Sequence, residues 1–349
     1  MRNLIVPILA AAILSLNTAS IYASECDFGD LDFDGTIGTS DLLALFSEWN
    51  NKNSPADLDG DGVVNTADIL ILFSNWGPTD LLAGGLPDLW INGSNCHEPT
   101  IQVHQYNQDM YILRQSLCTN FEGPFMYLLF GQDKVLMQDT GAGSIVLADT
   151  VYSIIDDWLV RNGKKSIDLI VSHSHSHGDH TQGDSQFQGQ PNTTVVQLSS
   201  TAVANFFGIS HWPNEIVEYD LGGRIVDVIP IPGHQTAHIA LYDRQTGNLF
   251  TGDTLYPGRL YISQFSTYIQ SIQRLVTFIE DKTVCNVFGT HIEMSNTPGD
   301  DYNFGATIHL DEHPLQLDRS HLLELLDGVI NMQDEPFIEV HDDFIIFPL

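Results

Sequence analysis

Basic side chains are scarce in this chain of 349 residues, which carries 13 Lys and Arg against 45 Asp and Glu and has a formal net charge of −32. Proteins that bind DNA or RNA need Lys and Arg to neutralise phosphates, and so do proteins that dock on anionic lipid. The composition therefore argues against both kinds of partner. Carboxylates instead suit Ca²⁺ and other cations.

Long apolar runs are also few. One extends from Leu4 to Leu16, after Met1-Arg2-Asn3 and before small and polar residues that reach Ala23 and Ser24. This pattern predicts a secretory signal peptide over residues 1–24, and the run is short for a membrane-spanning helix. We expect an exported protein (periplasmic, cell-surface or extracellular) with no integral membrane segment once this peptide is removed.

Cysteine is limited to four residues, Cys26, Cys96, Cys118 and Cys285. Export permits disulfides, and four cysteines allow three pairings. Cys96 and Cys118 flank a predicted hairpin, so we favour that pair. Cys285 lies in an apolar, strand-like run, which favours a buried free thiol.

An internal repeat follows the signal peptide, with matching loops 27 residues apart. Each copy has carboxylates at loop positions 1, 3, 5 and 12, glycine at position 6 and a backbone carbonyl available at position 7, as in EF-hand calcium loops. The predicted calcium ligands are Asp30, Asp32, Asp34, Thr36 and Asp41 in the first loop, and Asp57, Asp59, Asp61, Val63 and Asp68 in the second.

The repeat over residues 26–77 resembles a type I dockerin module, because each loop closes with Asp and precedes a helix. The resemblance implies a small all-α module, two Ca²⁺ ions and a cohesin-like partner contacted through Thr39-Ser40 and Thr66-Ala67. A calcium-rigidified spacer and a turn-rich acidic linker remain alternatives. Residues 78–94 have the Gly/Pro content of a linker, which leaves 95–349 as a second domain.

Short strands and a few helices alternate in this second part. We predict strands at 125–130, 134–138 and 167–171, and a helix at 144–160 with Ser144 as its N-cap. The tail 316–349 predicts a helix and a closing hairpin. The third strand runs directly into Ser172-His-Ser-His-Ser-His-Gly-Asp-His180, and imidazoles and carboxylate at this density suit Zn²⁺ or Fe²⁺.

The run 175–180 resembles the His-x-His-x-Asp-His signature of the metallo-β-lactamase-fold hydrolases, and four other motifs follow that family's order, each at a strand end. They are Asp139-Thr140-Gly141, Pro232-Gly233-His234, Gly252-Asp253-Thr254 and Gly289-Thr290-His291. The resemblance implies a four-layer αββα fold and a centre of two Zn²⁺ (or Fe or Mn). Its ligands would be His175, His177 and His234 for one metal, Asp179, His180 and His291 for the other, and Asp253 bridging them.

The resemblance also implies roles around the metals. Asp139 and His238 would support the ligands, and His173 would be a supporting or exposed residue. Asp253 stands where the best-known β-lactamase subclass has cysteine, which argues against β-lactam hydrolysis. His177 stands where flavodiiron proteins have glutamate, which argues against membership of that class.

The expected chemistry is attack of a metal-bridging hydroxide on a carbonyl, with Asp179 orienting the water. Esters, thioesters and lactones fit as small-molecule substrates. Tyr256 has either a substrate role or a packing role, and the segment 289–315 either lines the pocket or is a surface loop. A phosphodiesterase or iron oxygenase on the same metal frame, and a mainly cohesin-type binding protein, are the alternative functions.

Overall fold

The structure is a computed structural model that describes residues 29–32, 35–52, 54–59, 61–79, 81–82 and 84–349. The predicted signal peptide, Cys26 and the predicted calcium ligand Asp34 lie outside the described residues. Within the described part of the chain, no helix combines the length and the apolar character needed to cross a membrane.

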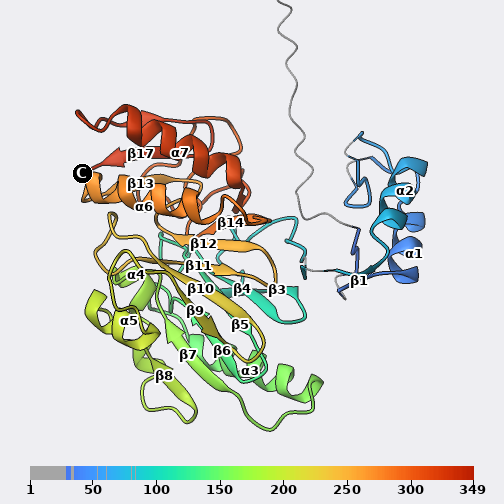
Figure 1. The fold of residues 1–349 in the computed structure, drawn as a ribbon, viewed down its shortest axis with the longest axis horizontal. Helices are drawn as coiled ribbons and strands as arrows, with labels where there is room; N and C mark the ends of the chain where they lie inside the picture. The colour runs from blue at the N-terminus through green and yellow to red at the C-terminus, as the bar shows by residue number, and fades with distance from the viewer. Residues whose placement is uncertain (1–28, 33–34, 53, 60, 80, 83) are drawn as a thin grey trace, which may run out of the picture.

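Two six-stranded sheets form the centre of the molecule (Figure 1). The first has the order β3-β4-β5-β6-β7-β8, with parallel pairing only between β6, β7 and β8. Its strands are β3 (Ile101–Asn107), β4 (Met110–Gln115), β5 (Phe125–Phe130), β6 (Lys134–Gln138), β7 (Asp168–Ser172) and β8 (Thr193–Val195).

The second sheet has the order β15-β14-β12-β11-β10-β9, and its parallel pair is β12 with β14. Its strands are β9 (Val217–Asp220), β10 (Ile225–Pro230), β11 (Ile239–Asp243), β12 (Asn248–Gly252), β14 (Asn286–Gly289) and β15 (Gln316–Leu317).

Side-chain alternation in β5 explains why the sheets stack. Phe125, Tyr127 and Leu129 face the second sheet, where they pack with residues of β10, β11, β12 and β14. The intervening residues Met126, Leu128 and Phe130 pack against helix α3 (Leu147–Arg161). A strand buried on both faces in this way belongs in the middle of a layered fold.

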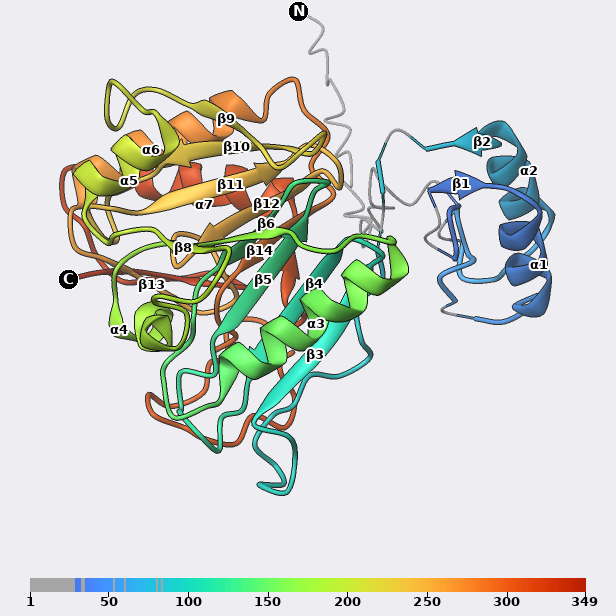
Figure 2. The ribbon, with the colours of Figure 1, turned by 90° about the horizontal axis from the view of Figure 1, so that it is seen from below.

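Helices cover the outer faces of the two sheets, as Figure 2 shows for α3 on the first. Helices α6 (Phe265–Phe278) and α7 (Arg319–Asn331) pack on the outer face of the second sheet. The four layers therefore follow the predicted αββα order, and this prediction of the fold class is confirmed.

The tail prediction of a helix and a hairpin is confirmed as well. After α7, strands β16 (Glu339–Val340) and β17 (Ile345–Pro348) pair antiparallel, and β17 also pairs in parallel with β13 (Arg259–Ile262). The remaining short helices of this part are α4 (Gly178–Thr181), the 3₁₀ turn η1 (Asp184–Gln186) and α5 (Ser200–Phe207).

The predicted start of helix α3 is wrong. Ser144 is not its N-cap: the helix begins at Leu147, and Ser144 has a φ of 61°. Gly141 and Gly143 also have positive φ, so the chain turns through left-handed conformations before it enters the helix. Gln186 replaces the local cap, because its Oε1 accepts hydrogen bonds from the backbone N–H groups of Leu147 and Ala148 at 2.9 and 3.1 Å.

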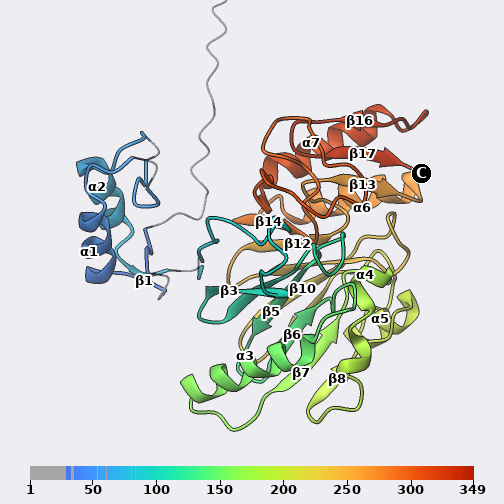
Figure 3. The same cartoon turned by 180° about the vertical axis from the view of Figure 1, so that it is seen from behind.

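Two short helices, α1 (Thr39–Ser47) and α2 (Thr66–Ser74), follow the two repeated loops and lie side by side (Figures 1 and 3). They share a small apolar cluster that includes Leu45 and Leu72. The two-residue strands β1 (Thr36–Ile37) and β2 (Gly77–Pro78) pair antiparallel and bring the two ends of this module together.

The favoured disulfide between Cys96 and Cys118 is confirmed, with Cα atoms 5.6 Å apart across the base of the β3–β4 hairpin. The predicted free thiol is wrong, because Cys285 is also disulfide-bonded. Cys285 precedes β14 and lies beside Gly247, where Leu81 of the linker also approaches. It is therefore at the contact with another segment, and not within the strand.

Candidate metal centre

Five segments that carry the predicted ligands leave their strands at one edge of the stacked sheets. Asp139 follows β6, and the histidine run 173–180 follows β7, which is parallel to β6. His234 comes four residues after β10, while Asp253 and His291 follow the parallel strands β12 and β14. Because the carboxyl ends of parallel strands meet at the same sheet edge, residues far apart in the sequence converge here.

The first ligand cluster joins three imidazoles and one carboxylate. His175 Nε2 lies 2.9 Å from His177 Nδ1 and 3.2 Å from His234 Nε2, and the last two nitrogens are 3.0 Å apart. Asp253 Oδ2 lies 3.5 Å from His175 Nε2 and from His234 Nε2. The three predicted ligands of the first metal and the predicted bridge thus meet at one point.

The second cluster shares Asp253 with the first. Asp179 Oδ2 lies 3.1 Å from His180 Nε2 and 3.3 Å from His291 Nε2, and those nitrogens are 3.4 Å apart. Asp253 approaches both rings, with Oδ2 3.4 Å from His180 and Oδ1 3.3 Å from His291. One carboxylate therefore faces two separate groups of ligand atoms, as a bridging ligand must.

Hydrogen bonds on the other ring nitrogen set the tautomer of these histidines. The Nδ1 atoms of His234 and His291 face the backbone carbonyls of Tyr261 at 2.6 Å and Glu122 at 2.9 Å. A carbonyl only accepts, so each Nδ1 carries the hydrogen and each Nε2 presents a lone pair to the centre.

Asp139 and Ser174 set the tautomers of two more ligand histidines, His180 and His175, in the same way. His180 Nδ1 lies 3.1 Å from Asp139 Oδ2, an acceptor. The Ser174 hydroxyl donates to the same oxygen at 2.8 Å, so it accepts from His175 Nδ1 at 3.1 Å. The Nε2 lone pairs of both rings therefore point inward as well.

The geometry fits metal ions better than hydrogen bonding. His175 and His234, as neutral rings protonated on Nδ1, have only acceptor nitrogens at the centre, yet their Nε2 atoms lie 3.2 Å apart. Ligand atoms about 2.0–2.1 Å from a tetrahedral Zn²⁺ are about 3.3–3.4 Å apart, close to the spacing of both clusters. The residues present therefore suit two transition-metal ions.

The charges of the two clusters differ. Burial and then the nearby His180 lower the pKa of His175 well below its ordinary value, and burial also lowers the pKa of His234. Burial opposes protonation of His180 and His291 too, but Asp253 and Asp179 hold the pKa of both well above the ordinary value. The second cluster is thus the more negative environment. A divalent cation in either cluster would offset the carboxylate charge there.

Asp139 holds the histidine loop in place. It is fully buried, has a φ of 70°, and accepts from the backbone N–H of Ser174 at 2.7 Å through Oδ1. The left-handed conformation is unfavourable for most residues but tolerated by Asp, and it persists where the surroundings fix it. In this position the Asp139 carboxylate contacts Ser174 near the start of the ligand loop and His180 at its end.

The other predicted supporting residues lie near the centre. His238 is buried with its ring 4.7 Å from that of His175, and its Nδ1 faces Thr254 Oγ1 at 3.3 Å. His173 is buried, not exposed, and its Nε2 lies 2.8 Å from Asp184 Oδ1. Asp184 has no motif of its own and could not be found from the sequence.

Thr290 is a further residue that the sequence reasoning missed. Its hydroxyl donates a hydrogen bond to Asp253 Oδ1. It stands inside the Gly289-Thr290-His291 motif, so its position next to a ligand was a signal that could have been used. The bond orients the carboxylate that faces both clusters.

Tyr256 lies behind the metal centre. Its side chain is buried, and its hydroxyl donates to the Arg259 carbonyl and lies 3.2 Å from Glu293 Oε2. Its ring centroid is 5.5 Å from that of His291. These contacts favour the packing alternative over the substrate contact, which stays a prediction.

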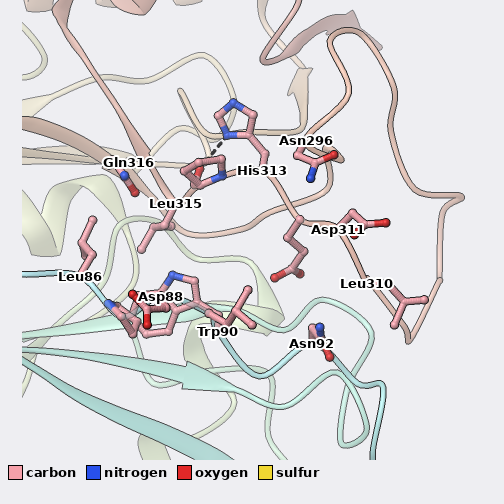
Figure 4. Close-up of a pocket in the computed structure, with 14 residues that line it drawn as sticks. Leu86, Asp88, Trp90, Asn92, Asn296, Leu310, Asp311, His313, Leu315 and Gln316 are labelled. Carbon is pink, nitrogen blue, oxygen red and sulfur yellow. Dashed lines mark hydrogen bonds between the residues drawn. The ribbon is translucent and has the colours of Figure 1, made fainter. Parts of the chain in front are cut away.

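Two pockets lie along the segment 289–315. A small one beside His291 is lined by Phe121, Glu122, Glu293, Asn303 and Phe304 among others. A cavity of about 270 Å³ lies further away, between linker residues such as Trp90 and the loop residues Asp311 to Gln316 (Figure 4). The segment therefore lines pockets, one of them next to a predicted ligand.

The two repeated loops have nearly the same internal hydrogen bonds. Asp30 Oδ2 accepts from Gly35 N–H at 2.9 Å, and Asp57 Oδ2 accepts from Gly62 N–H at 2.8 Å. The closing residues Asp41 and Asp68 are buried, and each accepts three backbone N–H bonds. Carboxylates gather into two candidate cation clusters, Asp30, Asp32 and Asp41 in the first loop and Asp57, Asp59 and Asp61 in the second.

A family model described as the metallo-beta-lactamase superfamily matches residues 119–291 of this chain. An acyl-coenzyme A thioesterase of Bos taurus is 27% identical over 200 residues, which cover 48% of this chain and 72% of that protein. A hydroxyacylglutathione hydrolase of Rhizobium meliloti is 28% identical over 167 residues, which cover 46% of this chain and 63% of that protein. A solved metallo-beta-lactamase from Pontibacter korlensis is 18% identical, with a TM-score of 0.44 over 66% of this chain and 99% of that one.

Proposed function

Because this chain carries a hydrolase domain of the metallo-beta-lactamase superfamily, we propose that it cleaves thioesters at a dinuclear metal centre. The observation that carries the proposal is the pair of ligand clusters that share Asp253. The names of the two relatives favour a thioester among the carbonyl substrates that this centre suits. Carboxylic esters and lactones are the second choice.

The reaction adds one water to the acyl carbon and breaks its bond to sulfur, so that a carboxylic acid and a thiol leave. Two bound divalent ions would supply a nucleophilic hydroxide at neutral pH and offset negative charge that develops on the carbonyl oxygen. The chain's own part begins with orientation: Tyr261 and Glu122 carbonyls, Ser174 and Asp139 hold the histidine lone pairs inward.

Asp179 has the best position for handling a proton. Its side chain keeps 21% of its surface exposed, whereas that of Asp253 keeps 8%. Burial opposes ionisation, but His180 and His291 hold the pKa of Asp179 well below its ordinary value. The carboxylate is therefore ionised at neutral pH and, at the open side of the centre, would orient the attacking water and accept its hydrogen.

The test is turnover of an acyl thioester by metal-replete protein, measured together with bound metal. His175→Ala combined with Asp253→Ala removes one ligand of the first cluster and the shared carboxylate. We expect loss of bound Zn²⁺ and at least about a hundredfold loss of kcat/KM. Full turnover and full metal content in this variant would refute the assignment. A single iron per chain in protein purified without added metal would instead favour the oxygenase alternative.

We further propose that residues 26–77 bind two Ca²⁺ ions and serve as a docking module. The support is the repeated loop pattern, the matching Asp30–Gly35 and Asp57–Gly62 hydrogen bonds, and the gathered carboxylates of each loop. Asp57 Oδ1 is buried and has no hydrogen-bond partner among the described residues, so it is available to a cation. A calcium titration by calorimetry on the full chain, with Asp57→Asn as the variant, tests this; unchanged stoichiometry would refute it.

Export and a cohesin-like partner are separate proposals. Export is supported by the pattern of residues 1–24 and by the disulfides, which persist in oxidising compartments. Expression of the full chain with detection in the medium, envelope and cytosol tests it. Deletion of residues 26–77 should abolish association with a partner or with cells and leave thioester turnover intact, if the module only docks the enzyme.

A further inference from the structure

The basic residues of the hydrolase domain lie mostly at the edge of the sheets opposite to the metal ligands. Lys134 begins β6, Arg224 precedes β10, and Arg244 lies in the turn before β12. Lys282 precedes β14, and Lys164 and Lys165 precede β7. The same strands end at Gln138, Pro230, Gly252, Gly289 and Ser172, directly before the ligand segments.

The length of the strands sets the distance between these basic residues and the metal ligands. A strand rises about 3.3 Å per residue, so the four to six residues of each strand put roughly 13–20 Å between its basic start and its ligand-bearing end. Most of these cations also have partners at the far edge. Arg224 pairs with Asp243 at 2.6 Å, and Arg244 pairs with Asp227 at 2.6 Å.

The cations at the near edge, which is the edge that bears the metal ligands, are neutralised by carboxylates. Arg114 is fully buried and holds Glu312 through two contacts of 2.5 Å. Arg259 is 9% exposed and pairs with Glu293 at 3.1 Å and Asp301 at 2.6 Å. Two carboxylates to one guanidinium leave this second group negative.

One other arginine approaches the near edge. Arg274 of α6 donates to the Pro230 carbonyl at 3.0 Å and to Asn214 Oδ1 at 3.1 Å. Its guanidinium is half-buried under the second sheet and is fixed on these acceptors. The two remaining arginines are held elsewhere: Arg161, at the end of α3, donates to the Tyr111 hydroxyl, and Arg319 donates to the carbonyls of Lys282 and Glu280. Among the described residues of the hydrolase domain, no Lys or Arg is therefore left to receive an anion at the metal centre.

The small pocket beside His291 is instead mainly acidic and aromatic. Glu122 and Glu293 line it together with Arg259, whose charge is offset by Glu293 and Asp301. Phe121 and Phe304 pack edge to face there, with ring centroids 5.3 Å apart, and Phe304 keeps 71% of its surface exposed. Such a rim offers contact to apolar groups and repels phosphates and carboxylates.

We propose that the substrate of this centre is an uncharged thioester with an apolar acyl chain, and not a coenzyme A or glutathione conjugate. This inference rests on the proposed thioesterase function and deepens it. Coenzyme A carries several phosphate charges and glutathione carries two carboxylates, and both need cations that this edge of the domain does not provide. The substrate class thus differs from those that the relatives' names state.

A matched pair of substrates tests the proposal on the metal-replete full chain. Hexanoyl-coenzyme A and the hexanoyl thioester of N-acetylcysteamine share the acyl group and the atoms around sulfur, but only the first is anionic. We expect kcat/KM to be at least about tenfold higher for the uncharged thioester at low ionic strength, and the gap to narrow with added salt. Equal or better use of the coenzyme A thioester would overturn the proposal.

A charge variant at the rim separates electrostatics from size. Asn303 is exposed and lines the small pocket, so Asn303→Lys adds one cation there and Asn303→Gln is the neutral control. The lysine should raise kcat/KM for the coenzyme A thioester about threefold or more relative to the uncharged one. A ratio equal in both variants would overturn the proposal. Hydrolysis of neither thioester, with both metals bound, would instead refute the thioesterase function itself.

Discussion

Asp139 contacts His180 through a carboxylate oxygen 3.1 Å from Nδ1, and the same oxygen accepts the Ser174 hydroxyl that orients His175. One buried side chain thus orients a histidine of each ligand cluster. Strand β6 is followed by this aspartate in a left-handed conformation, and the two contacts require that conformation. Asp139 is therefore a positioning residue, and its replacement should affect the binding of both metals.

Asp139→Asn should weaken metal binding without removing any ligand. The amide keeps the shape but presents a donor where two donors already point, so we expect Zn²⁺ affinity to fall about 10–100-fold. Competition with a chelator measures this directly. Asp168→Asn, at the exposed start of the neighbouring strand β7, is the control and should leave the affinity unchanged.

Gln186→Ala should destabilise the start of helix α3. The variant leaves the N–H groups of Leu147 and Ala148 without their acceptor, which costs about 1 kcal/mol, as for the loss of an N-cap. Urea unfolding of the full chain measures the free energy of unfolding. Gln188→Ala, at an exposed position two residues later, should change it by less than about 0.5 kcal/mol.

Replacing Cys96 and Cys118 by serine should lower the free energy of unfolding by about 3 kcal/mol, because the bond closes a loop of 22 residues and limits the unfolded chain. The double serine variant is the cleaner test, since a reductant would act on the disulfide of Cys285 as well. A variant as stable as the parent would show that the crosslink adds nothing to the packed hairpin.

The contact of His321 with Asp343 should make stability depend on pH. Burial opposes protonation, but Asp343 at 3.1 Å and Asp318 at 2.8 Å raise the pKa of His321, while His313 and His321 lower the pKa of Asp343. The histidine's contribution is complete below its unfolded pKa of about 6.5 and is lost as pH rises through the raised pKa. The carboxylate's contribution is present above about pH 3.9 and is lost in acid.

Asp343→Asn should therefore destabilise the protein most between about pH 4 and 6.5, by roughly 1 kcal/mol, and less at pH 9. Thermal unfolding across this range measures the difference from the parent. The exposed neighbour Asp342, changed to Asn, provides the control. A difference that grows toward pH 9 would contradict the expected direction of the pH dependence.

Local sequence patterns predict much of the fold. The strands β5 and β6 begin and end where the sequence predicts, because each is an uninterrupted run between Gly/Asp turns. The metal ligands could be predicted for the same reason: His234, Asp253 and His291 each follow a strand and stand in a short motif. Their mutual distances, and the tautomers set by Tyr261 and Glu122, required the folded chain.

The errors came from contacts between distant segments. Ser144 has the residue type of an N-cap, but the acceptor is supplied by Gln186, 39 positions after Leu147. Cys285 stands in an apolar run, yet it is disulfide-bonded and lies beside Gly247, which the linker residue Leu81 also approaches. Asp184 belongs to no motif and is recognised only through its contact with His173.

The placement of Lys134, Arg224, Arg244 and Lys282 at the starts of strands that end in metal ligands has a consequence for encounters in solution. Arg224 and Arg244 are paired there with Asp243 and Asp227, so these cations offset acidic charge at the far edge and leave the ligand-bearing edge as the more negative side of the domain. An approaching anion would therefore be repelled least at the far edge, and collisions with anionic molecules would favour that edge. Neutral molecules experience no such bias and sample every approach equally.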